Sequence, residues 1–444
     1  MGSAAKLYRV RFFLAFLLFA LSGISFLVRT NISIAGIQIG EEFGLGNQRL
    51  GWIFSAFLIG YAGFQVPAGW LAARYGPRKM LTLSTLWWGV STALVAVLPS
   101  SLPNAIFLLI MIRLMLGAGE SVMYPAANQF VARWIPVRER GLINGLIFAG
   151  VGAGSGLTPP MLNWIISHDG WRGAFYFSSL LGIAVGILWW VTARDTPAEQ
   201  PNISGLELGE IESGLRVVRV PNGEFQDESR HRAEINWRKL LGRRDLPALM
   251  LGYFCFGYVS WIYFSWFFLY MAQVRGFELK ASAQISMLPF LSMTFCCLAG
   301  GALSDWLTQK GGLRIGRCWT STGALLLTGT FLLLGSRAQS PLNAGLILAC
   351  GAGALYISQS SFWSVAIDIA DQSSGVFSSM VNMGGQIGGA VTASLTPWIA
   401  QHFGWTASFA VAAAVAALGG LCWLFVHPEQ PLIFAPKSEQ TQAA

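Results

Sequence analysis

Residues 10–39 read VRFFLAFLLFALSGISFLVRTNISIAGIQI. This predominantly apolar run is longer than the roughly 20 residues that an α-helix needs to cross the hydrocarbon core of a bilayer. It is too long for the apolar core of a secretory signal peptide, and no small-residue cleavage site follows it. We therefore expect residues 10–39 to form a membrane-spanning helix that stays in the mature protein.

Eleven further stretches have the same character, so the sequence predicts twelve spans. The others lie at about 50–72, 80–98, 104–132, 142–166, 173–193, 245–270, 283–303, 316–335, 342–367, 375–400 and 405–426. Hydrophobic residues make up 54% of the 444 residues and charged residues only 11%, less than half the roughly 25% of soluble domains. This composition excludes a disordered chain, a nucleic-acid-binding protein and a secreted disulfide scaffold. It predicts an all-α polytopic membrane protein.

The basic residues indicate how the spans are oriented. Most of the 29 Lys and Arg residues fall in segments that are intracellular if the N-terminus is cytoplasmic. Positively charged loops stay on the cytoplasmic side of a membrane, so both termini are predicted to be cytoplasmic. The net charge of +8 is then mainly a signal of topology, and we expect a multi-pass protein of the cell inner (plasma) membrane.

One long polar segment divides the predicted spans into six and six. We predict an N-terminal six-helix bundle at 1–193, a cytoplasmic linker at 194–244, a C-terminal six-helix bundle at 245–427 and a cytoplasmic tail at 428–444. The linker is rich in Glu, Arg, Pro and Asn, which is typical of a connection between domains.

Short sequence pairs recur at equivalent places in the two bundles. Asn144 and Asn382 are 238 residues apart, Gly170-Trp171 and Gly404-Trp405 are 234 apart, and Gly69-x-Leu71 and Gly301-x-Leu303 are 232 apart. Nearly constant offsets indicate a parallel repeat of two six-helix halves. This is the architecture of major facilitator transporters, whose substrate site lies between the halves near the membrane midplane.

Three charged residues lie deep inside predicted spans: Glu120, Arg29 and Arg113. A charge in the bilayer interior costs several kcal/mol, so each is a candidate for function. Arg113, Gly117, Glu120 and Tyr124 are spaced to share one face of a helix, so Arg113 becomes a candidate substrate contact. The alternative is structural: Arg113 and Glu120 could contact each other or a neighbouring helix.

Arg29 and Glu120 together favour an organic anion moving with a proton. The planar guanidinium of Arg29 matches a carboxylate through two parallel hydrogen bonds. A carboxylate removed from water, such as Glu120, can hold a proton near neutral pH. The structural alternative for Arg29 is an ion pair with Glu120 or a bond to a backbone carbonyl.

Residues 29–35, RTNISIA, resemble the R-x-N-x-S-x-A signature of the anion:cation symporter family. Further similarity to this family lies in residues 55–70, 113–126 and 133–140; it runs over nearly the whole chain and is strongest in the first four spans. The family includes bacterial galactonate, glucarate and hexuronate transporters and the animal sialic-acid and vesicular glutamate carriers.

The resemblance implies a secondary active transporter that works by alternating access and carries an organic anion, a sugar acid or similar carboxylate, in symport with a proton. Arg29 resembles the ligand of the substrate carboxylate and Glu120 the protonation site. The other positions that resemble substrate contacts are Tyr61, Ser360, Trp363 and Asn382. No enzyme activity, cofactor or metal is implied, and the expected partners are a small organic anion, a proton and the lipid bilayer, with the protein monomeric.

The sequence departs from the family pattern in two places. Val28 precedes Arg29 where many bacterial members have Asp, which removes one titrating group from the first span. The loop motif G-x-L-x-D-R-x-G-R-R lacks its acid at Ala73 but keeps two of its basic positions, whereas the second copy keeps the acid. The predicted gating residues are Arg74, Arg78 and Asp305.

Four alternatives to symport would each need a feature of their own. An organophosphate antiporter would use a second deep cation in the seventh span, where only Arg275 occurs, at the outer edge. A drug:proton antiporter suits a deep arginine poorly. A non-transporting membrane sensor should carry a further soluble domain, and a membrane enzyme should show a nucleophile or a metal cluster in its sequence.

Overall fold

The computed structural model describes residues 10–45, 47–215, 237–267, 270–276 and 279–432, which contain helices and turns but no β-strand. The helices before the linker are α1 (Val10–Ile34), α2 (Gly36–Phe43), α3 (Asn47–Tyr75), α4 (Pro77–Val97), α5 (Ala105–Glu120), α6 (Met123–Trp134) and α7 (Arg140–Thr192). The linker contains α8 (Gly205–Gly214) and α9 (Trp237–Leu241). The helices after it are α10 (Asp245–Ser265), α12 (Leu279–Leu313), α13 (Thr320–Arg337), α14 (Pro341–Ile357), α15 (Gln359–Ala370), α16 (Ser374–Phe403) and α17 (Trp405–Cys422).

Nine helical ranges of the described chain are long and apolar enough to cross a membrane. Two of them, Val137–Thr192 and Met287–Arg337, have 56 and 51 residues, about twice the length of one crossing. The backbone leaves helical geometry inside both, at Gly170 with φ 70° and at Gly312 with φ 85°. The 30-residue α16 is not among the nine. The number twelve therefore stays a prediction.

Three predicted spans are interrupted within the described chain. The range 10–39 is divided between α1 and α2, 104–132 between α5 and α6, and 342–367 between α14 and α15. At two of these breaks a serine hydroxyl bonds back to a carbonyl three residues earlier, Ser121 to Ala118 and Ser358 to Leu355, both at 2.7 Å. Such bonds compete with the helical ladder and bend helices. Hydropathy alone does not detect them.

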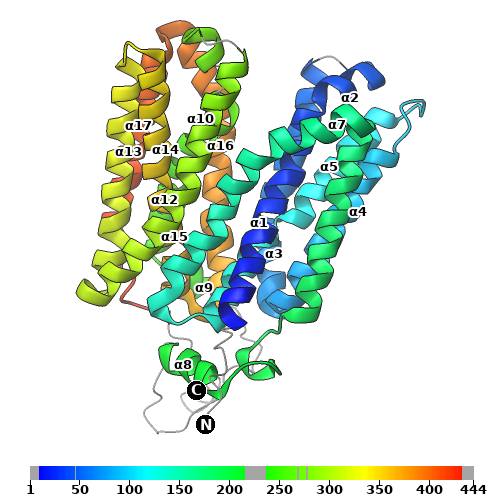
Figure 1. Cartoon of the computed structure of the whole chain (residues 1–444). Helices are drawn as coiled ribbons and strands as arrows, with labels where there is room; N and C mark the ends of the chain where they lie inside the picture. The colour runs from blue at the N-terminus through cyan, green and yellow to red at the C-terminus, as the bar shows by residue number, and fades with distance from the viewer. Residues whose placement is uncertain (1–9, 46, 216–236, 268–269, 277–278, 433–444) are drawn as a thin grey trace, which may run out of the picture.

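The helices form two groups, α1–α7 and α10–α17, which we call the first and second groups. In Figure 1 the first group lies mainly to the right and the second to the left. The described glycines with positive φ fall into three pairs, 44 with 276, 76 with 312 and 170 with 404, separated by 232, 236 and 234 residues. Only glycine adopts this conformation readily, so the repeat seen in the sequence is also a repeat of backbone turns.

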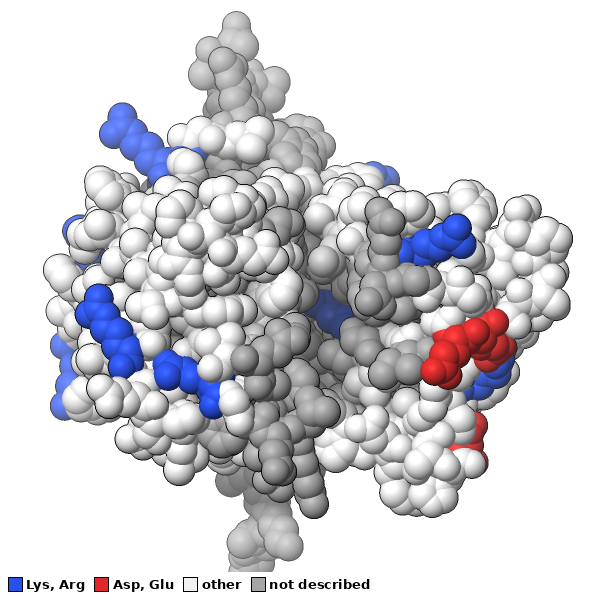
Figure 2. Space-filling view, turned by 90° about the horizontal axis from the view of Figure 1, so that it is seen from above, with Lys and Arg blue, Asp and Glu red and all other residues white. Residues whose placement is uncertain are grey.

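The two groups meet at one end of the molecule and separate at the other (Figure 1). The closed end carries α8, where Glu207 accepts hydrogen bonds from the backbone of Val10 and Arg11 at 3.0 Å. Leu432, the last described residue, bonds to the Ile369 carbonyl at 2.7 Å. We call this the linker end and the opposite end the open end. Figure 2, a view onto the open end, shows a hollow between the groups with Lys or Arg atoms at its bottom.

Candidate substrate site

A cavity of about 70 Å³ lies between the two groups. Its aromatic lining residues are Phe26, Tyr61, Tyr124, Phe148, Tyr253, Phe256, Trp261, Phe264 and Tyr356. The remaining lining residues are Arg29, Val151, Gly257, Ser260, Gln359, Asn382, Gly385 and Gln386. Both groups contribute to this wall, as the parallel repeat predicts.

Arg29 projects from α1 into the wall of the cavity. Its Nε donates a hydrogen bond to Glu120 Oε1 at 2.8 Å, and Ser25, one turn earlier on α1, donates to the same oxygen. The guanidinium carbon lies 4.5 Å from the centre of the Tyr61 ring and 4.7 Å from that of Phe26. The Arg29 NH2 nitrogen is buried without a hydrogen-bond partner among the described residues. The guanidinium is thus held through its Nε by Glu120 and lies against two aromatic rings.

Glu120 is the last residue of α5 and is fully buried. Gly117, one turn earlier, lets α5 approach α3 closely, because a side chain there would collide with the Phe57 carbonyl. Glu120 Oε2 has no hydrogen-bond partner among the described residues.

Arg113 lies behind this pair and is not among the residues lining the cavity. It is 2% exposed, and its guanidinium lies 5.0 Å from the centre of the Phe57 ring, while that of Arg29 lies 5.5 Å from the same ring. Its Nε and NH1 have no hydrogen-bond partner among the described residues. On this face of α5, Glu120 therefore lies next to the cavity wall, whereas Arg113 lies deeper in the first group.

Two predicted contact residues, Tyr61 and Asn382, meet across the cavity. Asn382 Nδ2, on α16, donates to the Tyr61 hydroxyl, on α3, at 3.4 Å. This bond joins the two groups beside Arg29, since the Tyr61 ring also covers the Arg29 guanidinium.

Ser360 and Trp363 are not among the lining residues. Trp363 lies one layer behind, where its indole donates to the Tyr253 hydroxyl at 3.3 Å and its ring lies 4.8 Å from that of Phe148. The Ser360 hydroxyl is buried without a partner among the described residues. Gln359, which the sequence analysis missed, lines the cavity and also donates to Tyr253, at 3.0 Å.

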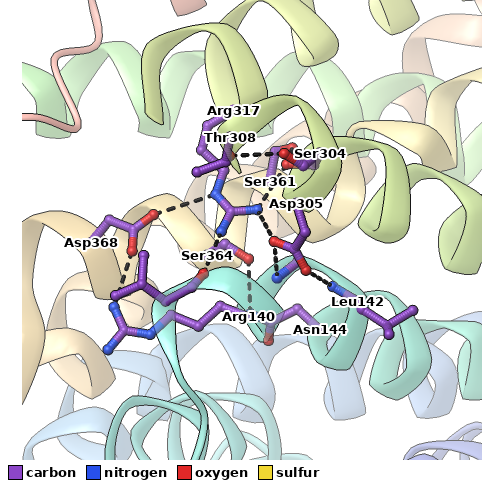
Figure 3. Close-up of polar contacts among 12 residues, drawn as sticks. Arg140, Leu142, Asn144, Ser304, Asp305, Thr308, Arg317, Ser361, Ser364 and Asp368 are labelled. Carbon is purple, nitrogen blue, oxygen red and sulfur yellow. Dashed lines mark hydrogen bonds and ion pairs between the residues drawn. The ribbon is translucent and has the colours of Figure 1, made fainter. Parts of the chain in front are cut away.

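The linker end is closed by a buried ionic network (Figure 3). Asp305 accepts hydrogen bonds from the backbone of Gly141 and Leu142 at 2.9 and 2.7 Å, which caps the start of α7. Arg317 bonds to Asp305 at 2.7 Å and to Asp368 at 3.4 Å. Arg140 of the first group completes the network by bonding to Asp368 at 3.0 Å.

The other two predicted gating residues lie outside this network. Arg74 is exposed and stacks over Trp70 at 5.1 Å. Arg78 bonds through its backbone to Asp195 at 2.9 Å and through its guanidinium to the Trp190 carbonyl at 2.8 Å, all within the first group. The described residues contain no cluster of three or more His, Cys, Asp or Glu that could hold a metal ion.

Comparisons with known proteins agree on one family. A family model described as Major Facilitator Superfamily matches residues 18–393 and 314–443. The chain is 31% identical over 412 residues, 91% of each chain, to a Cupriavidus necator protein named "Probable sulfoacetate transporter SauU". It is 26% identical to the "Probable L-galactonate transporter" of Escherichia coli, covering 95% of this chain and 90% of that protein.

Solved structures resemble the fold. The proton:xylose symporter XylE, solved with 6-bromo-6-deoxy-D-glucose, superposes with a TM-score of 0.72 over 94% of this chain and 96% of that one. The sequence identity is 16%, so this likeness bears on the fold alone.

Proposed function

From the premise that the chain belongs to the major facilitator superfamily, we propose that it is a secondary active transporter that carries a small organic anion together with a proton. The observation that carries the proposal is the Arg29–Glu120 ion pair, in which a cation that lines the cavity is bonded at 2.8 Å to a fully buried acid behind it. Relatives of the chain are named as anion transporters and not as enzymes.

The proposed architecture has twelve spans in two six-helix halves, 1–193 and 245–427. The linker and both termini are cytoplasmic, and a monomer lies in the inner membrane. The two double-length helical ranges with their glycine breaks support the number of spans. The distribution of basic residues supports the orientation.

Binding of the anion is assigned to Arg29. Its Nε is engaged by Glu120 and its side chain lines the cavity, so a substrate carboxylate can approach the guanidinium from the cavity side. Tyr61 and Asn382 flank this position from the two halves, and Arg113 adds positive charge behind Phe57. In this scheme Ser360 and Trp363 act from behind the wall and support the cavity through Tyr253 and its neighbours.

Proton binding is assigned to Glu120. When the anion reaches Arg29, two negative groups share one guanidinium, and a proton on Glu120 removes the conflict. Proton and anion therefore increase each other's affinity, and this coupling is reciprocal. Binding of both in one half-cycle makes the transport a symport.

Alternating access requires the closed linker end to open. The halves are joined there by Asp305, Arg317, Asp368 and Arg140, so opening separates these groups. Asp305 is the proposed gate residue of the second half. Arg74 and Arg78 are the proposed gate residues of the first half.

Uptake by the purified protein in proteoliposomes, with the outside more acidic than the inside, tests the proposal. A panel of organic acids is supplied at equal concentration, and protein-free liposomes provide the background. We expect at least one acid to accumulate only when the pH gradient is present. Absence of uptake for every acid, or accumulation that ignores the gradient, would contradict proton-coupled anion transport.

A further inference from the structure

The cavity offers its occupant a single charged group. Among the described lining residues Arg29 is the one charged side chain. Arg113, the nearest further cation, stays behind Phe57 and does not reach the cavity. A second anionic group on the substrate would be buried without a cation, which is costly. The charge of the wall thus suits an anion with one acidic group.

The body of the cavity is made of rings. Nine of its seventeen lining residues are aromatic, and they come from both groups of helices. Phe26 and Phe264 lie across the boundary between the groups with their ring centres 5.8 Å apart. Aromatic rings prefer to pack against flat, polarisable groups in stacked or edge-to-face geometry. The narrow volume, about 70 Å³, favours a compact body.

The hydroxyl groups of the lining tyrosines are already engaged with other side chains. Tyr124 pairs with Ser22 at 3.1 Å and Tyr356 with Ser260 at 3.3 Å. Tyr253 accepts from Gln359 at 3.0 Å.

Further polar side chains without charge line the cavity: Ser260, Gln359, Asn382 and Gln386. Among the lining atoms closed off from solvent, Arg29 NH2 and Gln386 Oε1 have no hydrogen-bond partner among the described residues.

Together these features separate three substrate classes. A compound with two acidic groups lacks a second cation, and an anion without a flat ring forgoes the stacking contacts of the nine aromatic lining residues. We infer that the site takes a compact monocarboxylate with a flat aromatic body, whose carboxylate binds Arg29 and whose ring packs between the aromatic walls. This rests on the proposed transport of an organic anion through the same cavity.

Binding to the purified full-length protein, measured by calorimetry at mildly acidic pH, tests the inference without interference from membrane-permeant acids. The probes are benzoate, cyclohexanecarboxylate, gluconate and sulfoacetate. We expect benzoate to bind about tenfold more tightly than gluconate or sulfoacetate and several-fold more tightly than cyclohexanecarboxylate, which has the same charge without a flat ring. Tighter binding of gluconate or sulfoacetate overturns the inference but leaves anion transport intact. No binding of any acid, together with no uptake, overturns both.

Replacing an aromatic side chain of the cavity wall with a branched aliphatic side chain gives a second test. Phe264→Leu should lower the affinity for benzoate about threefold to tenfold and leave that for cyclohexanecarboxylate nearly unchanged. A misfolded variant would lose both ligands equally, and Phe26→Leu then serves as the second variant. Phe107→Leu, at a 61% exposed position on α5 outside the lining, is the matched control and should keep the preference for benzoate. Loss of both ligands in equal measure by both folded wall variants would contradict stacking.

Discussion

The two groups of helices repeat each other in backbone but differ in charge. Around the cavity, the first group supplies Arg29, Glu120 and the deeper Arg113, whereas the second supplies Tyr253, Gln359, Asn382 and Gln386. Counted with the 232-residue offset of the Gly44–Gly276 pair, Arg29 corresponds to Trp261, a ring that also lines the cavity. The two groups thus share a repeated backbone, but among the described lining residues only the first group contributes a charged side chain.

At the linker end the charge lies on the other copy. Asp305 of the second group caps the start of α7 with a carboxylate. The equivalent position of the first group is Ala73, and the start of α16 is capped instead by Gln129, whose Oε1 accepts from Gly375 at 3.1 Å and from Ser374 at 3.3 Å. We call the contact of Asp305 with the start of α7 and the contact of Gln129 with the start of α16 the two bridges between the groups. The first is made by a carboxylate and the second by a neutral amide, so the two bridges should differ in strength.

Removal of the cavity cation should have the largest effect. Arg29→Ala should abolish anion uptake in proteoliposomes because no other described lining residue carries positive charge. Arg29→Lys should recover little, since an ammonium group cannot replace the planar fork. Arg337→Ala, at an exposed position of the second group, is the control and should transport normally. Near wild-type uptake by Arg29→Ala would show that the positive charge of Arg29 is not what binds the anion.

Neutralisation of Glu120 should separate exchange from accumulation. Glu120→Gln keeps the shape of the side chain but cannot release a proton, so accumulation driven by a pH gradient should be lost. Counterflow, the exchange of labelled for unlabelled substrate, needs no net proton movement and should persist. If Glu120→Gln still concentrates substrate when only protons drive it, the coupling site lies elsewhere, and Asp368 is the next residue to substitute.

The sequence singles out Arg29 and Glu120 because a charge inside an apolar run is rare and costly, and the structure joins the two in an ion pair. It could not tell which uncharged residues face the cavity. Gln359 lines the wall because the helix breaks at Ser358, and that break depends on a side-chain hydrogen bond rather than on hydropathy. Ser360 and Trp363, expected from family resemblance, lie on the same helix but turn away from the cavity lining. Tertiary packing decides which side of a helix faces the cavity, and a single sequence does not show that packing.

The two bridges at the linker end predict unequal losses of stability. Asp305→Ala should lower the free energy of unfolding by about 3–5 kcal/mol, because it leaves the buried Arg317 without one of its carboxylates. Gln129→Ala should cost about 1–3 kcal/mol, the usual penalty for buried groups that lose a neutral acceptor. Thermal unfolding of both variants in the same detergent measures the difference. A larger loss for Gln129→Ala would mean that charge is not what makes the Asp305 bridge strong.

The smallest predicted effect concerns the open end, where the groups again differ in charge. In the first group Arg172 holds Glu42 of α2 through two hydrogen bonds of 2.6 Å. In the second group Arg275 bonds instead to backbone carbonyls, those of Ala338 at 2.7 Å and Ser336 at 2.9 Å. Of these two arginine contacts, only that of Arg172 contains an acid among its described partners. The stability that it contributes should therefore depend on pH, whereas that of the Arg275 contact should not.

The direction of that dependence follows from the pKa of Glu42, which the hydrogen bonds from Arg172 lower from the ordinary value of 4.5. A lowered pKa in the folded state means that the ion pair contributes its full stability above the ordinary carboxyl range and loses it as the pH falls through the folded value. Both side chains are about one-third exposed, so solvent limits the contribution to about 0.2–1 kcal/mol. The difference in thermal stability between the wild type and Glu42→Gln should therefore be small at pH 7 and should vanish at pH values well below the ordinary carboxyl range. Arg275→Gln should instead show a loss that is the same at both pH values, because carbonyl acceptors do not titrate. If the stability advantage of the wild type over Glu42→Gln grew on acidification, the pH dependence would have the opposite sign. That result would refute a stabilising Arg172–Glu42 ion pair at the open end.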